Sequence, residues 1–566
     1  MSEAPNHPQS GRKIETLERI VLAAAFAVVA LLAIAFMMRG GFDSDEPQHL
    51  HVAWEWTQGR IQYRDVFDNH APLFHLVMAP IAALVGERFR ILVIMRFVNS
   101  VFYVLALVGA YLLSGRFFER RVALWTAALV AVYPAFFRYA LQFRPDTAWT
   151  AVVALSLWVL VGGNLTARRG FVSGLLLGVA AGVSLKTSLV FVALLGAAAL
   201  LPLASASAWH RLSRRGVLAA AAGLCAGVLV VPVFVAVSFA ALGAWKDFVR
   251  CTVAHNVLPG FGRWGHSLQM LIVFPVIAAT WLAARGVDKR GASLGVDARF
   301  TFLVCVAGTS LAALVVMPLV RPQTTLPAVL IVIVVAAGLA DELVLGKIAA
   351  RPGARSAGAF ALAVPVVVFL TGAGLSARYA HLGRDNTREG EERLEAVLAL
   401  TGPADYVLDA KGENIFRRRP CYFVLEQLTL ERIRRGLTGD DVVKRCIETK
   451  TLLFAGRLRA FPAADREFIK TNYLPTGAVA VAGKVLSAEA VAPGARISFE
   501  VVIPAEYAVL GDAGEGRGAL DGSAYTGARY LDAGAHAWVN SSPQGRLYLV
   551  WSRAVQRGFL PTGLWE

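Results

Sequence analysis

The stretch GFDSDEPQHLHVAWEWTQGRIQYRDVFDNHAPLFH, residues 41–75, contains six acidic residues, four histidines and two tryptophans. It directly follows an apolar run at residues 20–38, which has about the length that a bilayer-spanning helix needs. Acidic side chains are costly inside lipid, so this cluster is expected at a membrane surface. The stretch therefore raises the question of what its carboxylates do at the end of a membrane span.

The composition of the whole chain indicates a membrane protein. Of its 566 residues 56% are hydrophobic and only 17% are charged, and the mean hydropathy is +0.55. The net charge of +16 does not indicate nucleic acid as a partner, because excess Lys and Arg in membrane proteins lie in cytoplasmic loops. The five cysteines include no C-x-x-C pair, so no zinc or redox motif is visible.

Apolar runs alternate with short charged loops up to residue 376, which predicts an α-helical polytopic membrane domain. We expect about eleven crossings, at residues 20–38, 95–115, 121–140, 147–163, 170–185, 187–207, 216–240, 267–284, 300–319, 324–344 and 357–376. The short run at residues 72–85 begins with proline, and we expect a re-entrant or interfacial helix there rather than a span.

The loops indicate an orientation. Arg12, Lys13 and Arg19 place the N-terminus in the cytoplasm. The loops that fit the same side contain Arg116, Arg120, Arg121, Arg168, Arg169, Arg211, Arg214, Arg215, Arg285, Lys289, Arg290, Lys347, Arg351 and Arg355. An odd number of crossings then places the acidic stretch and the C-terminal tail on the outer face. The composition and short loops favour a bacterial inner membrane.

The core of the acidic stretch is Asp43-Ser44-Asp45-Glu46, which precedes an amphipathic helix through Trp56 that suits the membrane interface. Asp43 or Ser44 could cap this helix, but a cap needs one such residue. The adjacent carboxylates of Asp45 and Glu46 raise one another's pKa, which suits a general base or a cation site. Asp43-x-Asp45 could hold a divalent cation. We nevertheless expect no metal or other cofactor, and the spacing of His49, His51, His70 and His75 matches no standard zinc site.

The stretch, together with later motifs, resembles the polyprenyl-phosphate-sugar-dependent glycosyltransferases of the C-type (GT-C) fold, which include protein O-mannosyltransferases and lipid A aminoarabinose transferases. The first outer loop has Asp-Glu, an interfacial helix, Gly and Tyr, and then His-x-Pro-Leu. The later motifs are Phe143-Arg144-Pro145-Asp146, Ser184-Leu185-Lys186-Thr187, His255-Asn256 with Arg263 and His266, and Arg321-Pro322-Gln323 with Leu326-Pro327. The likeness covers most of residues 20–345. Asn69-His70-Ala71-Pro72 replaces the acidic-Lys-Pro-Pro form of the aminoarabinose enzymes, which leaves the acceptor open.

The resemblance implies an enzyme that transfers a sugar, with inversion, from a polyprenyl phosphate to a lipid, glycan or protein acceptor at the outer face. Asp45 would act as the base or as a positioning carboxylate, and Glu46 and Asp146 would orient it or bind the sugar. The donor phosphate would be bound by Lys186, Arg144, Arg263 and Arg321. The sugar or acceptor would be contacted by Trp54, Tyr63, His70, His255 and Asn256. The expected partners are these two substrates and the bilayer, with no nucleic acid.

The sequence predicts three parts. Residues 1–376 would form the transmembrane catalytic domain, with an outer-face interfacial loop at 41–94. Residues 377–478 would form a small α/β domain, in which Cys421 and Cys446 could pair or remain free thiols. Residues 479–566 contain short alternating strands that predict a β-sandwich. Its residues Trp538, Tyr548 and Trp551 could stack on carbohydrate or form the sandwich core.

Two other functions compete with the enzyme. A transporter or flippase of a lipid-linked substrate would carry internal repeats and charges near mid-span, and neither is evident. A membrane scaffold has no need for paired acids at the membrane surface. The sequence leaves the sugar and the acceptor open.

Overall fold

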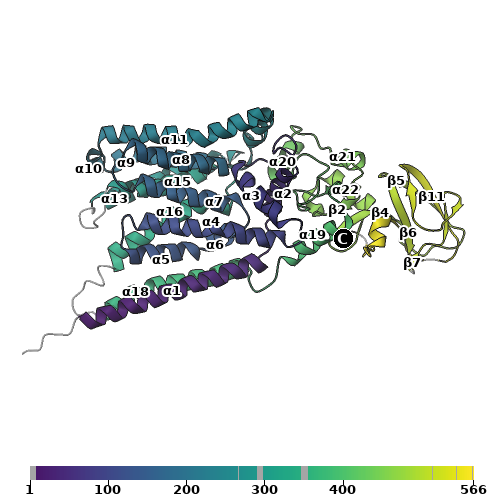
Figure 1. Cartoon of the computed structure of the whole chain (residues 1–566), viewed down its shortest axis with the longest axis horizontal. Coiled ribbons are helices and arrows are strands. Elements are labelled where there is room, and N and C mark those ends of the chain that lie inside the picture. Colours follow the sequence, from purple (N-terminus) through teal and green to yellow (C-terminus); the bar gives the residue numbers. More distant parts are fainter. Residues whose placement is uncertain are drawn as a thin grey trace, which may run out of the picture. The chain divides into compact units, whose positions relative to one another are not determined.

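All of the apolar runs predicted to span the membrane are helical in the computed structural model (Figure 1). The structure describes residues 8–265, 267–289, 298–345, 355–512, 514–543, 545–563 and 565. Four residues of the predicted loops lie outside the described residues: His266 of the outer loop and Arg290, Lys347 and Arg351 of the cytoplasmic loops. The side chains of Arg12 and Lys13 are not described either.

The chain divides into two compact units. The first, called the helical unit here, consists of the described residues up to Gly41, His70–Val77 and Val93–Asp385. The second, called the mixed unit, consists of Phe42–Asn69, Met78–Leu92 and the described residues from Asn386 onward. We expected the loop at 41–94 to belong with the membrane helices, but most of it packs in one unit with the C-terminal region.

The eleven predicted crossings correspond to helices of different lengths. Among the described residues, eight helices are long and apolar enough to cross a membrane: α1 (Pro8–Arg39), α4 (Ile91–Ser114), α9 (Thr187–Ala204), α11 (Arg214–Ala241), α13 (Val273–Lys289, lengthened by the 3-10 turn before it), α15 (Ala298–Val316), α16 (Leu326–Ala340, lengthened by its short helical neighbours) and α18 (Arg355–Tyr379). A ninth crossing is formed if α5 (Arg120–Ala131) and α6 (Pro134–Ala140), which meet at 70°, act as one bent span. The remaining two runs form α7 (Pro145–Leu160) and α8 (Ala167–Val183), with 16 and 17 residues.

Two helices of the helical unit, α8 and α11, approach each other through glycine. A Cβ atom added to Gly170, Gly174, Gly223 or Gly227 would lie 2.0 to 2.2 Å from a backbone carbonyl oxygen of the other helix. Only glycine permits such an approach, and small residues at four-residue spacing are typical of close helix packing in membranes. Because glycine adds little to hydropathy, apolar content alone does not reveal this contact.

The helix α3 (Leu73–Val85) agrees with the expectation for residues 72–85. Its 13 residues would extend about 20 Å, which is shorter than the roughly 30 Å apolar core of a bilayer. The helix α2 (Asp45–Thr57) has nearly the predicted bounds but a different environment. Its residues from Glu46 to Glu55 are all buried, whereas an interfacial helix would keep its polar side exposed. The polar groups of α2 instead bond within the mixed unit, as described below.

The first part of the C-terminal region alternates short helices and strands, as predicted. It contains α19 (Arg388–Leu400), β1 (Val407–Leu408), α20 (Gln427–Arg434), α21 (Val442–Glu448), β2 (Leu453–Phe454), α22 (Ala463–Asn472) and β3 (Tyr473–Pro475). Cys421 and Cys446 are both buried there and are not bridged to each other. Burial raises the pKa of the Cys421 thiol to about 12, so this thiol is protonated at neutral pH.

The second part consists of strands in two sheets (Figure 1). Its strands are β4 (Ala480–Ser487), β5 (Arg496–Val501), β6 (Ala505–Gly511), β7 (Gly514–Glu515), β8 (Gly518–Leu520), β9 (Ser523–Ala524), β10 (Arg529–Leu531), β11 (Gly534–Asn540) and β12 (Leu547–Trp551). One sheet has the order β1-β2-β4-β12-β6-β10, with β3 on β4 and β7 on β6, and the other has the order β5-β11-β8-β9. Since β4 pairs with β2, β3 and β12, one sheet continues across the division that we placed between residues 478 and 479.

The aromatic residues of this region belong mainly to its core. Trp538 is completely buried and Trp551 nearly so, and both pack in the apolar core that runs through the two sheets. Tyr548 is partly buried against the same core. The structure therefore favours the core interpretation over the stacking interpretation for the two tryptophans.

Candidate functional site

The helical unit contains a buried group of three charges that the sequence motifs singled out. The Asp146 carboxylate accepts a hydrogen bond from Lys186 Nζ at 2.6 Å through Oδ1 and from Arg144 Nε at 3.1 Å through Oδ2. Asp146 lies in the first turn of α7, directly after Pro145, and Lys186 immediately precedes α9. Two loops that are 40 residues apart thus bring their charges to one point.

The exposure of these three side chains differs. The Asp146 and Arg144 side chains are 1% and 2% exposed, whereas that of Lys186 is 23% exposed. Two cations surround one carboxylate, so the group has a net positive charge and its accessible member is an ammonium. A carboxylate held by two cations is a weak base, so Asp146 fits a role in positioning Arg144 and Lys186 better than a role in proton transfer.

Hydrogen bonds hold the loop that carries Arg144. Asn99 on α4 donates from Nδ2 to the carbonyl oxygens of Gln142 at 2.6 Å and Arg144 at 3.4 Å. Thr147 Oγ1 donates to the carbonyl of Ala140 at 2.8 Å. The position of the Arg144 guanidinium is therefore fixed from both ends of the loop.

Three polar atoms near this group have no hydrogen-bond partner among the described residues: Asn99 Oδ1, Gln142 Oε1 and Trp149 Nε1. All three side chains are almost completely buried. Buried polar atoms in native proteins normally have a partner, which can be water or a ligand. Two acceptors and one donor are thus enclosed in this part of the helical unit without a partner among the described residues.

The other predicted residues of the helical unit lie on separate segments. The backbone N–H of Arg263 donates to the carbonyl of Pro318 at 2.9 Å, and Arg321 precedes the short 3-10 helix Pro322–Thr325. His255 is buried at the end of the π-helical turn Arg250–Ala254, and Asn256 Nδ2 donates to the Thr252 carbonyl at 3.0 Å. His70, also in this unit, is partly buried.

The acidic residues at the start of α2 belong to the mixed unit, where two of them cap the helix. Glu46 Oε1 accepts a hydrogen bond from the Asp43 N–H at 2.9 Å, and Asp43 Oδ1 accepts one from the Asp45 N–H at 3.1 Å. This reciprocal pattern is that of a capping box. The Glu46 carboxylate is buried and accepts its hydrogen bond from a nearby backbone N–H group. The capping interpretation anticipated such a role for Asp43 but not for Glu46.

Asp45 has a different partner. Its Oδ1 accepts a hydrogen bond from Lys411 Nζ at 2.5 Å, and the same ammonium lies 3.2 Å from Ser44 Oγ. The two side chains remain partly accessible, at 21% for Asp45 and 15% for Lys411. Motif analysis missed Lys411, since a single lysine in a polar loop carries no signal; Asp409 and Gly412, which shape that loop, were the features that could have indicated it.

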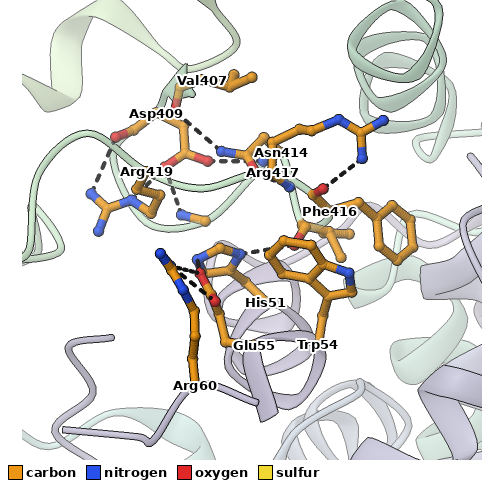
Figure 2. Close-up of polar contacts among 12 residues, drawn as sticks. His51, Trp54, Glu55, Arg60, Val407, Asp409, Asn414, Phe416, Arg417 and Arg419 are labelled. Carbon is orange, nitrogen blue, oxygen red and sulfur yellow. Dashed lines mark hydrogen bonds and ion pairs between the residues drawn. The ribbon is translucent and has the colours of Figure 1, made fainter. Parts of the chain in front are cut away.

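The face of α2 beyond Asp45 is held by buried polar contacts (Figure 2). Glu55 accepts hydrogen bonds from Arg60 Nη1 through both carboxylate oxygens, each at 3.1 Å. The His51 Nε2 atom lies 3.5 Å from the same carboxylate, and its Nδ1 atom lies 2.8 Å from the carbonyl oxygen of Ile415. The loop after β1 therefore contacts α2 directly.

The two aromatic residues expected to stack on a sugar are buried in the mixed unit. Trp54 packs its ring against that of His51, with 5.8 Å between the ring centroids. Tyr63 is completely buried, has a left-handed backbone with φ of 74°, and accepts a hydrogen bond from the Tyr422 hydroxyl at its carbonyl oxygen. Both rings serve the packing of this unit, which leaves little ring surface for a sugar.

One segment of the chain matches a known family model. Residues 69–236 match the family model described as dolichyl-phosphate-mannose-protein mannosyltransferase. No curated protein matches the chain by sequence.

The fold is shared with ArnT from Cupriavidus metallidurans. The apo structure of ArnT is 14% identical and superposes with a TM-score of 0.52 over 83% of this chain and 98% of that chain. The ArnT structure bound to undecaprenyl phosphate is also 14% identical, with a TM-score of 0.50 over 77% and 92% of the two chains. An oligosaccharyltransferase AglB from Archaeoglobus fulgidus is 14% identical, with a TM-score of 0.42 over 90% and 74%. The family match and the two ArnT structures confirm the predicted resemblance to the GT-C glycosyltransferases.

Proposed function

We propose that this protein is an integral membrane glycosyltransferase that transfers a sugar from a polyprenyl phosphate to an acceptor. The observation that carries the proposal is the positively charged group of Arg144, Asp146 and Lys186, built into a unit of apolar helices with one accessible ammonium. The GT-C fold and the family match over residues 69–236, which includes all three residues, support it.

The charged group would bind the phosphate of the donor. A phosphate gains negative charge as the bond to the sugar breaks, and cations that are already in place stabilise this charge without reorganisation. Lys186 would make direct contact, because its side chain is accessible, while Arg144 would contribute its positive charge from a buried position. Asp146 keeps the two cations close together despite their repulsion.

The buried polar atoms next to the charges would contact the sugar. Asn99 Oδ1 and Gln142 Oε1 would accept hydrogen bonds from sugar hydroxyls, and Trp149 Nε1 would donate one. A site built to hydrogen-bond a hydroxyl discriminates strongly against a ligand without it, because its own polar groups then remain unpaired. These residues would therefore help to select the sugar, whether a hexose or a pentose.

The reaction would be a direct displacement. An acceptor hydroxyl attacks the anomeric carbon, the bond from that carbon to the phosphate oxygen breaks, and the phosphate leaves with the electron pair. The hydroxyl proton passes to a base if the acceptor is not already anionic. Asp45 would be that base or would position the acceptor. Arg263, Arg321, His255 and Asn256 remain candidates for further substrate contacts.

The site would face the periplasm of a bacterial inner membrane, with the N-terminus in the cytoplasm and the mixed unit outside. This orientation follows from the basic loops. A lipid, a glycan and a protein are all possible classes of acceptor.

The test uses the purified full chain with lipid-linked sugars extracted from its own membranes. A transferase releases polyprenyl phosphate in step with a new sugar–acceptor bond, and mass spectrometry measures both products. We expect Lys186→Met to abolish both products. Lys246→Met, at an exposed lysine of α12 (Trp245–Val249) in the same unit, should have no effect. A transporter or flippase would move the lipid between leaflets and leave the sugar–phosphate bond intact, which would overturn the proposal.

A further inference from the structure

The ammonium of Lys411 lies where a divalent cation would be expected to bind the acidic start of α2. Asp43-x-Asp45 places two carboxylates two residues apart, which is a spacing that hard cations use. In the structure Lys411 Nζ is 2.5 Å from Asp45 Oδ1 and 3.2 Å from Ser44 Oγ. Three N–H donors of one ammonium can serve several such oxygens at once.

The charges around Lys411 are negative. Burial of the ammonium lowers the pKa of Lys411, but the carboxylate of Asp45, together with those of Glu426 and Asp43, more than offsets burial and leaves the pKa above its usual value. Lys411 is therefore protonated at neutral pH. Its ammonium thus supplies a positive charge beside Asp45, at the place where a metal ion would otherwise supply one.

Lys411 lies in a loop that is shaped by contacts of Asp409, which Figure 2 shows. The Asp409 carboxylate accepts hydrogen bonds from the N–H groups of Gly412 and Asn414, at 2.8 and 2.9 Å, and from Arg419 Nε at 2.7 Å. Gly412 has φ of +97°, and a Cβ atom at this position would lie 2.9 Å from His51 Cβ. The loop therefore turns tightly against α2, directly beside Lys411.

A metal ion and this ammonium would compete. Two like charges about 4 Å apart repel strongly at the low effective dielectric of a partly buried site. Among the side chains that the structure describes, no group of three or more His, Cys, Asp and Glu residues is arranged to hold a metal ion. Asp43 and Glu46 are also engaged with backbone N–H groups of the helix cap.

We infer that Lys411 acts as a built-in counter-cation for Asp45 and takes the place of a divalent metal ion in the proposed transferase. This inference rests on the proposed function. Lys411 is a positioning residue, since it acts on the reaction only through its ion pair with Asp45. The inference has one specific consequence. Removal of the ammonium should create a requirement for a metal ion that the natural protein does not have.

The experiment measures Mn²⁺ binding and sugar transfer with the purified full chain. Electron paramagnetic resonance should detect no Mn²⁺ at Asp45 in the natural protein, bound Mn²⁺ in Lys411→Met, and none in Lys411→Met combined with Asp45→Asn. Sugar transfer by the natural protein and by Lys411→Arg should be insensitive to EDTA. Transfer by Lys411→Met should fall roughly 10- to 100-fold in EDTA and recover in part with Mn²⁺. Lys444→Met, at an exposed lysine of α21, is the matched control and should behave as the natural protein.

Three results would overturn the inference: Asp45-dependent Mn²⁺ binding by the natural protein, loss of its activity in EDTA, or full EDTA-resistant activity of Lys411→Met. The first two need no variant, so misfolding of Lys411→Met cannot obscure them. If no preparation transfers sugar, the proposed function fails, while Mn²⁺ binding still tests the exchange of ammonium for metal.

Discussion

The two charged groups of this molecule are built in opposite ways. In the helical unit Asp146 is enclosed by two cations from residues 2 and 40 positions away, at the ends of consecutive apolar helices. In the mixed unit Asp45 pairs with a single lysine 366 positions away, in a loop among further carboxylates. The first group is net positive and suits a phosphate, whereas in the second an ammonium already pairs with the carboxylate. Charges at helix ends can be found from the sequence, but a charge supplied by a distant loop cannot.

The largest effect is expected from Asp146→Asn, which removes the negative charge between two cations. Arg144 would remain buried after losing its ion pair with Asp146, and breaking a buried ion pair in this way costs about 3–5 kcal/mol. We expect a large drop in the unfolding temperature together with loss of sugar transfer. Asp247→Asn is the control, because Asp247 pairs with Arg250 on a more exposed surface of the same unit. Equal stability of both variants would show that the Asp146 group is not a structural centre.

The next largest effect is expected from Arg60→Met in the mixed unit. Arg60 donates to both oxygens of the buried Glu55 carboxylate, and its loss should cost about 2–3 kcal/mol because a buried charge is left with only His51 nearby. Thermal unfolding measures the change. Arg64→Met provides the comparison, since Arg64 pairs with its exposed neighbour Asp65 and should change the midpoint little. If both substitutions are silent, the contacts of α2 in Figure 2 do not hold this unit together.

A smaller effect is expected from Gly412→Ala. The left-handed backbone and the contact with His51 together should cost about 1–2 kcal/mol and displace the loop that carries Lys411. Gly439→Ala, whose added Cβ meets no atom within 4 Å, should be neutral. Transfer should fall in Gly412→Ala with a change in kcat rather than only in stability. Normal transfer by a stably folded Gly412→Ala would contradict the claim that this loop positions Asp45.

The smallest effect concerns pH. Burial, and then the nearby Asp440 and Asp441, raises the pKa of Asp465 from 3.8 to about 7. A carboxyl group with a raised pKa in the folded state binds its proton there while the unfolded chain has already released it, so stability should fall as pH rises from about 4 to about 7. Asp465→Asn should remove this part of the pH dependence of the unfolding temperature. An unchanged pH profile would show that Asp465 is ionised in the folded protein.

Sequence patterns predicted local structure well where one periodicity dominated. All eleven apolar runs are helical, and the short alternating strands predicted within residues 479–566 are present as β4 to β12. The motif residues Arg144, Asp146 and Lys186 do meet, because each lies at the end of an apolar helix.

The patterns were less informative where contacts join distant segments. The amphipathic pattern of α2 suggested a membrane interface, but His51 and Glu55 have partners at Ile415 and Arg60. Asp409 and Gly412 mark the loop of Lys411, but no local feature connects this loop with Asp45, which is 366 positions away. The division at residue 478 ignored the pairing of β4 with strands on both sides of it, since pairing partners are set by tertiary structure rather than by the alternation within one strand.

The most direct test of the account is binding of polyprenyl phosphate, without a sugar, to the purified protein. Native mass spectrometry would compare the natural protein with Lys186→Met and with the control Lys246→Met. The account predicts that the natural protein and the control retain the lipid phosphate and that Lys186→Met retains little of it. Equal retention by all three proteins would contradict the assignment of the Arg144–Asp146–Lys186 group as the phosphate site.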